Sequence, residues 1–120
     1  MTVEEFKDKY PEGKKFKVVD TVYTLHYASE VDNYKMRNAN GITELYSKEI
    51  ILDLGDAFSS PEAMDKVELY YERVLRHELM HAFFFELGLR NYCDDEVLVD
   101  MLAIKFSSLE KLLSQADNFR

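Results

Sequence analysis

The sequence predicts an α+β domain in which strand-like segments precede two helices. Residues 14–28, 42–46 and 49–54 are rich in Val, Ile, Thr, Tyr and Phe, and polar turn-forming stretches separate them. From about residue 60 the chain can be helical as far as Leu87, and a second helix can follow from about Asp94 to Leu113. The chain has 120 residues and no repeat or linker, so we expect one domain that spans residues 1–120.

The charge balance and the apolar pattern limit the partners of this chain. The net charge is −8 and the only basic cluster is short, at residues 14–17, so we expect no nucleic-acid partner. No apolar run approaches the roughly 20 residues of a membrane span, and the first residues lack the apolar stretch of a secretory signal. The single cysteine, Cys93, cannot form an internal disulfide. We therefore expect a cytoplasmic protein that has no membrane partner.

The first third of the chain predicts a short helix and a long strand. Residues 2–10 have the pattern of an amphipathic helix that ends before a proline. Residues 14–28 are expected to form one long strand or a bent pair of strands. The polar segment that follows is a turn region, and it ends in the strong turn dipeptide Asn40-Gly41.

The next two segments predict an antiparallel hairpin. Residues 42–46 and 49–54 are separated by the two-residue stretch Ser47-Lys48. Residues 49–54 have the more continuous apolar run and should lie inside the sheet, whereas residues 42–46 are the better candidate for the edge strand.

The ends of the two predicted helices carry recognisable capping residues. Ser59 and Glu62 have the spacing of a capping box, with a proline in the first turn between them. Gly88 is the expected left-handed residue just past the end of the first helix. A short connection then leads to the second helix, whose positive end carries Asp94 and Asp95.

The first of these helices contains a His-Glu-x-x-His motif. His77 and His81 lie four residues apart, so both rings project from one face of the helix. This spacing lets two imidazole nitrogens bind one metal ion at about 2.0–2.1 Å each. Glu78 is rotated by about 100° from His77, which suits a general base better than a ligand. The alternative is a helix with two partly exposed histidines and an unrelated glutamate.

The second helix offers the acidic residues that a third ligand requires. Glu96, Asp100 and Ala103 form a stripe along one face, with apolar residues on either side. Two carboxylates in so apolar a helix would be poorly solvated unless a metal ion and a metal-binding histidine paired with them. A stripe that faces solvent is the alternative, whereas Asp94 and Asp95 are explained by the helix start.

These two motifs together resemble a known family. His77-Glu78-Leu79-Met80-His81 followed by Glu96-x-x-x-Asp100 resembles the gluzincin-type zinc metallopeptidases. The segment "EVLVDMLA" is similar to the corresponding segment of ImmA/IrrE-like peptidases, and "RHELMHAFFFELGL" resembles small metallopeptidase-like proteins of bacteriophages and prophages. The resemblance covers about residues 40–106.

The resemblance implies a fold and a metal site. The fold is a minimal zincin-like one, in which a small, twisted, mostly antiparallel sheet packs on the motif helix and a second helix follows. The edge strand would be offered to an extended peptide. The site is one zinc ion (Zn²⁺) per chain, held by His77, His81 and Glu96. The His81 to Glu96 spacing is shorter than in large gluzincins, so Asp95 or Asp100 is the alternative third ligand.

The resemblance also implies an activity. Glu78 would be the general base, and Asp100 would accept a hydrogen bond from a ligand histidine. We therefore expect a zinc-dependent metallopeptidase, a hydrolase that cleaves peptide bonds of a protein or peptide substrate. The alternative function is a non-catalytic zinc-binding protein of the same fold that acts by protein–protein interaction.

Three other residues are weaker candidates for the site. His26 is expected to be a surface or core histidine of a strand, with a contact at the rim of the cleft as the alternative. Cys93 is expected to be a small buried apolar residue, although as a further zinc ligand it would close the site. Tyr92 is the best candidate for stabilising an oxyanion.

Overall fold

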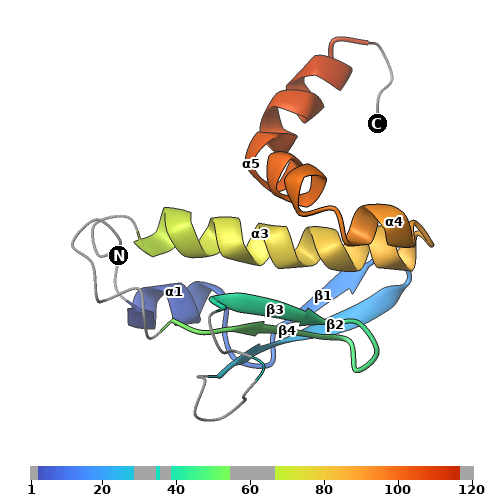
Figure 1. Ribbon diagram of the computed structural model, residues 1–120. Coiled ribbons are helices and arrows are strands. Elements are labelled where there is room, and N and C mark those ends of the chain that lie inside the picture. The colour runs from blue at the N-terminus through green and yellow to red at the C-terminus, as the bar shows by residue number, and fades with distance from the viewer. Residues whose placement is uncertain (1–2, 29–34, 36–38, 55–66, 117–120) are drawn as a thin grey trace.

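The computed structural model describes residues 3–28, 35, 39–54 and 67–116 of the chain, and its element order confirms the predicted α+β class (Figure 1). A short amino-terminal helix is followed by four strands and then by three helices in the described part. The elements are α1 (Val3–Lys9), β1 (Lys15–Val18), β2 (Thr21–Tyr27), β3 (Gly41–Glu44), β4 (Glu49–Leu52), α3 (Val67–Glu86), α4 (Arg90–Cys93) and α5 (Glu96–Leu113).

The four strands form one mixed sheet in the order β1-β2-β4-β3. The β1–β2 and β3–β4 pairings are antiparallel, and the β2–β4 pairing is parallel. The sequence predicted a mostly antiparallel sheet; the parallel pairing arises because the β3–β4 hairpin docks on β2 through its second strand. The predictions that β3 is an edge strand and that β4 lies inside the sheet are confirmed. The predicted long strand is the bent pair β1 and β2.

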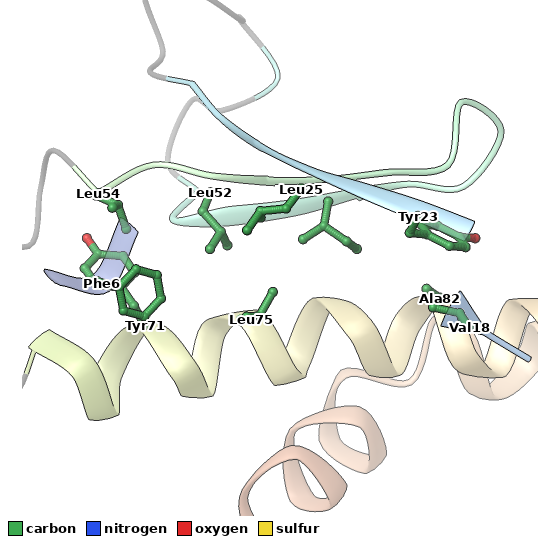
Figure 2. Packing of buried hydrophobic residues seen from close by; sticks show 10 residues of the cluster. Phe6, Val18, Tyr23, Leu25, Leu52, Leu54, Tyr71, Leu75 and Ala82 are labelled. Carbon is green, nitrogen blue, oxygen red and sulfur yellow. The ribbon is translucent and has the colours of Figure 1, made fainter. Parts of the chain in front are cut away.

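Helix α3 lies across one face of the sheet, and the main core lies between the two (Figures 1 and 2). Alternate residues of the inner strands point at α3, because successive side chains of a strand face opposite sides. The ring of Phe6, from α1, packs near the ring of Tyr71, with the centroids 5.7 Å apart. The fully buried residues of this core are Phe6, Tyr23, Leu25, Ile50, Leu52, Tyr71 and Ala82.

Among the buried residues that the structure describes on the sheet-facing side of α3, one is charged. Tyr71, Leu75 and Ala82 are spaced at i, i+4 and i+11 and are all buried in the core. Glu78 stands at i+7 of the same stripe and is only 7% exposed. The general base predicted from the motif therefore occupies a position that an apolar residue fills elsewhere along this helix.

Gly41 has a different role from the one its sequence context predicts. The dipeptide Asn40-Gly41 is a turn signal, but Gly41 is the first residue of β3. A Cβ atom at this position would lie 2.8 Å from Val74 Cγ1 and 3.1 Å from Glu78 Cγ. The absence of a side chain at Gly41 thus lets the edge strand approach α3 closely, next to Glu78.

The end of α3 follows the prediction, but the connection after it does not. Gly88 has a φ of 79°. The backbone N–H groups of Gly88 and Leu89 donate to the carbonyls of Phe85 and Phe84 at 3.0 and 2.9 Å, which is the Schellman arrangement. The expected connection contains the short helix α4. Helix α5 begins at Glu96 rather than at Asp94, because the preceding aspartate caps its amino terminus.

Helix α5 packs on the side of α3 that faces away from the sheet, and its carboxyl-terminal half points away from α3 (Figure 1). A second cluster of buried residues, Phe84, Cys93 and Val99, joins α3, α4 and α5. Within the described ranges, no helix combines the length and the apolar character that crossing a membrane requires. The predicted capping box at Ser59 and Glu62 lies outside the described residues.

Candidate metal centre

The two motif histidines and one acidic residue of α5 converge on one point. His77, His81 and Glu96 each place a ligand atom within 4.8 Å of the others. His77 Nε2 lies 2.8 Å from Glu96 Oε2, and His81 Nε2 lies 3.1 Å from Glu96 Oε1. The two Nε2 atoms are 3.1 Å apart. The structure therefore contains a candidate metal-binding triad, made of the residues that the sequence singled out.

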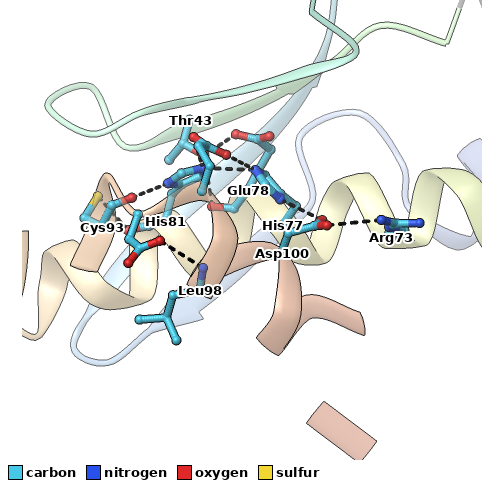
Figure 3. A network of polar contacts seen from close by, with 10 residues as sticks. Thr43, Arg73, His77, Glu78, His81, Cys93, Leu98 and Asp100 are labelled. Carbon is cyan, nitrogen blue, oxygen red and sulfur yellow. Dashed lines mark hydrogen bonds and ion pairs between the residues drawn. The ribbon is translucent and has the colours of Figure 1, made fainter. Parts of the chain in front are cut away.

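The second nitrogen of each ring contacts a hydrogen-bond acceptor (Figure 3). His81 Nδ1 lies 2.5 Å from the carbonyl oxygen of Cys93, which can only accept, so this nitrogen carries the proton. His77 Nδ1 lies 3.3 Å from Asp100 Oδ1, and an ionised carboxylate also only accepts. In neutral rings this pattern leaves both Nε2 atoms without a proton, and a lone pair on each is directed at the other ligand atoms.

The donor set of this site fits a divalent cation. Two unprotonated imidazole nitrogens and a carboxylate repel one another when they share so small a space, unless protons or one cation lie between them. Two nitrogen ligands of a tetrahedral zinc ion, at about 2.0–2.1 Å each, are about 3.3 Å apart. The observed 3.1 Å between the Nε2 atoms is close to this value. One ion would satisfy all three residues at once.

The two alternative third ligands have other partners. The Asp95 side chain accepts a hydrogen bond from the backbone N–H of Leu98 at 3.0 Å and so caps α5. Asp100 lies on the outer side of His77, and its Oδ2 also contacts Arg73 Nη2 at 3.1 Å (Figure 3). Neither aspartate belongs to the convergent set.

Glu78 lies on the sheet side of the two histidines. Thr43 Oγ1, from the edge strand β3, is 2.8 Å from Glu78 Oε1 and 2.9 Å from the Glu78 carbonyl oxygen. Burial raises the pKa of the Glu78 carboxyl, and the Thr43 hydroxyl and the two nearby imidazoles oppose this shift. A carboxyl group with a raised pKa is better suited to accept and return a proton near neutral pH than an ordinary surface glutamate.

The site is enclosed on one side and open on the other. The side chains of His77 and His81 are 20% and 13% exposed, whereas that of Glu96 is 67% exposed. The helices and the edge strand therefore shield the histidines, and the site opens towards solvent at Glu96. An approaching ligand could reach the triad from this side without unfolding the core.

His26 and Cys93 do not belong to the convergent ligand set. His26 points to the face of the sheet opposite α3, because it alternates with the buried Leu25, and its Nδ1 lies 2.6 Å from Glu12 Oε2. Cys93 is buried, and its thiol donates to the carbonyl of His81 at 3.2 Å. Burial raises the pKa of this thiol, so it stays protonated. The Tyr92 ring packs near that of Phe84, with the centroids 6.2 Å apart.

The sequence did not predict two of the residues that contact the site. Arg73 precedes His77 by four residues, so a helical pattern places it on the same face and could have indicated a partner for an aspartate of α5. Thr43 gave no local signal, because its contact with Glu78 depends on how the edge strand crosses α3. Comparison with protein-family models, with curated proteins and with solved structures finds no match to this chain.

Proposed function

We propose that this chain is a zinc-dependent metallopeptidase of minimal zincin-like fold, which hydrolyses peptide bonds of a protein or peptide substrate. The observation that carries the proposal is the convergence of the ligand atoms of His77, His81 and Glu96 within 4.8 Å, with both Nδ1 atoms at acceptors. A structural zinc site is usually closed by four protein ligands, whereas three ligands and an open side are typical of a catalytic site.

In this proposal each residue has one task. His77, His81 and Glu96 hold one zinc ion per chain. Asp100 and the Cys93 carbonyl fix the tautomers of the two rings, so that each Nε2 presents its lone pair. When bound, zinc would act as a Lewis acid, which would polarise a carbonyl group and make a water molecule more acidic.

Glu78 is the proposed general base. Its carboxyl group takes a proton from the attacking water molecule and then gives this proton to the leaving amine. The burial of Glu78 supports this role, because burying a carboxylate costs stability that one hydroxyl contact offsets only in part, and carboxyl groups perturbed in this way are common at functional sites. Its neighbours in that stripe, Leu75 and Ala82, are apolar.

The edge strand offers a place for the substrate. β3 pairs with β4 on one side, and no other strand among the described residues pairs with it on the other. An extended peptide can add to such an edge through main-chain hydrogen bonds. Because Thr43 of this strand contacts Glu78, a peptide bound along β3 would pass next to the proposed base.

One observation favours the alternative, a zinc-binding protein that acts by protein–protein interaction. The carboxyl-terminal half of α5 points away from α3 (Figure 1) and carries large apolar side chains that are exposed. Exposed apolar clusters of this kind are common at protein–protein contacts. They are Phe106, Leu109, Leu112 and Leu113, which are 37–61% exposed.

A cleavage screen tests the proposal. The protein is purified without added metal, its zinc content is measured by mass spectrometry, and it is incubated with a library of fluorescence-quenched peptides. We expect about one zinc per chain and cleavage of some peptides, which a chelator abolishes and added zinc restores. A protein that holds zinc and cleaves no peptide in the library would favour the alternative. A protein that binds no zinc would contradict both.

A further inference from the structure

We infer that Thr43 is a positioning residue for Glu78: its hydroxyl holds Oε1 of the carboxyl group, so that Oε2 is the oxygen that carries the transferred proton. This inference rests on the proposed function for its consequence in catalysis, but the contact itself does not depend on that function. Thr43 comes from β3 and Glu78 from α3, 35 residues apart in the chain.

The Thr43 hydroxyl contacts both the side-chain carboxyl group and the main-chain carbonyl group of Glu78. Thr43 Oγ1 lies 2.8 Å from the side-chain Oε1 and 2.9 Å from the main-chain carbonyl oxygen of the same residue (Figure 3). Threonine has one hydroxyl proton, so it donates one strong bond at a time. The carbonyl is inside a helix and accepts the usual intrahelical bond, whereas Oε1 depends on a side-chain donor. We therefore expect the Thr43 hydroxyl to donate to Oε1 rather than to the main-chain carbonyl.

This bond distinguishes the two oxygens of the carboxyl group. While Glu78 is ionised, Thr43 donates to Oε1. When Oε2 takes a proton from the attacking water molecule, Oε1 becomes the carbonyl-type oxygen of a neutral acid and still accepts from Thr43. The same contact can persist while Oε2 passes the proton to the leaving amine. The carboxyl group then needs no rotation between the two proton transfers, which keeps it in reacting geometry.

Gly41 sets the distance at which this contact forms. It lies two residues before Thr43, so both residues face α3. A Cβ atom at Gly41 would lie 3.1 Å from Glu78 Cγ and 2.8 Å from Val74 Cγ1. The strand can therefore approach α3 closely enough for the Thr43 hydroxyl to reach Glu78.

The experiment compares three variants of the zinc-loaded protein. Thr43→Val keeps the shape of the side chain and removes the hydroxyl, and Thr43→Ser keeps the hydroxyl and removes the methyl. Thr24→Val is the matched control, because the Thr24 hydroxyl contacts Lys15 at 3.2 Å rather than the site. For each, kcat and KM are measured on a peptide that the wild type cleaves in the screen. Zinc content and melting temperature are measured alongside.

We expect Thr43→Val to lower kcat by about 10–100-fold, as small misplacements of a catalytic group do. KM and zinc content should stay near their wild-type values. Thr43→Ser should restore most of kcat, and Thr24→Val should keep it. If Thr43 only stabilised the fold, its substitution would lower the melting temperature without lowering kcat selectively at an unchanged KM. A kcat of Thr43→Val equal to that of the wild type would overturn the inference.

Crystal structures of the variants provide a readout other than activity. In Thr43→Ser the Glu78 carboxyl group should keep its position, and in Thr43→Val it should turn away from β3. If Thr43→Val does not fold, Thr43→Ala replaces it in both measurements. A Glu78 carboxyl group that stays in place without the hydroxyl would contradict the inference. This result is independent of the proposed function, which fails instead if the wild type cleaves no peptide.

Discussion

The Nε2 atoms of His77 and His81 lie 3.1 Å apart and face each other, while the Nδ1 atom of each ring contacts an acceptor on another helix. Two histidines spaced by four residues on an exposed helix face would not need this arrangement. It requires α4 and α5 to return to α3 and to place the Cys93 carbonyl and Asp100 at the outer edges of the rings. In neutral rings, this arrangement orients the lone pairs of both Nε2 atoms towards Glu96.

The first prediction separates the two acidic residues of α5. Glu96→Ala should abolish most of the zinc affinity, because it removes one of three proposed ligands. Asp100→Asn should lower the affinity by about 10–100-fold, as the loss of a hydrogen-bond partner of a ligand histidine does. Competition with a chromophoric chelator measures both values.

Asp95→Ala is the control for this pair. Asp95 caps α5 through the backbone N–H of Leu98. Its removal should cost about 1 kcal/mol of stability and leave the zinc stoichiometry unchanged. If Asp100→Ala lost the metal while Glu96→Ala kept it, the roles assigned to these two residues would be reversed.

The second prediction concerns the close approach at Gly41. Gly41→Ala should lower the free energy of unfolding by about 1–3 kcal/mol, because the added methyl would lie 2.8 Å from Val74 Cγ1 and must displace it. Urea denaturation measures the change. In the background of Val74→Ala, which removes the nearest obstructing atom, the same substitution should cost clearly less. Equal costs in the two backgrounds would show that the strand does not approach α3 at this point.

The third prediction is a pH dependence at the far end of α3. Glu86 accepts from Lys48 Nζ at 2.6 Å and from the Tyr23 hydroxyl at 2.7 Å. These hydrogen bonds hold the pKa of Glu86 below its ordinary value, and the bond with Lys48 has the largest effect. The unfolded chain therefore takes up this proton at a higher pH than the folded protein does. The stabilisation is complete above about pH 4.3 and is lost as the pH falls through the folded-state pKa.

Glu86→Gln isolates this contribution. At pH 7 the variant should be less stable than the wild type by about 1–2 kcal/mol, because a charge-assisted hydrogen bond becomes a neutral one. Below pH 4 the difference should shrink, since the wild-type carboxyl is then protonated as well. Urea denaturation at a series of pH values measures both. A difference that stays constant down to pH 2 would contradict the assigned contacts.

Much of the site could be predicted from local sequence patterns. The i, i+4 spacing of His77 and His81 fixes their common face, and the i, i+4 spacing of Glu96 and Asp100 does the same on α5. Helix periodicity alone therefore indicated which four side chains could meet. It could not rank Glu96 against Asp100 as the ligand, because that depends on where α5 crosses α3.

The tertiary contacts were harder to predict. The continuous apolar run of residues 49–54 indicated that β4 lies inside the sheet, but its parallel direction relative to β2 depends on how the hairpin is oriented against β2, which the residues of the two strands do not encode. The dipeptide Asn40-Gly41 predicts a turn, and the sequence does not distinguish this role from a close approach to α3, because turns and close backbone approaches both favour glycine. Thr43 is one of several strand threonines, and only the packing of β3 on α3 distinguishes it from Thr24.

The most direct test of the central claim is the rate of peptide hydrolysis by Glu78→Gln relative to the wild type at equal zinc content. Glutamine keeps the size of the side chain and can accept from Thr43, but it cannot take up the proton. We predict that the rate falls by about 10²–10⁴-fold or more, whereas zinc content and melting temperature stay nearly unchanged. A variant that holds zinc and cleaves the same peptide as fast as the wild type would contradict the proposed role of Glu78.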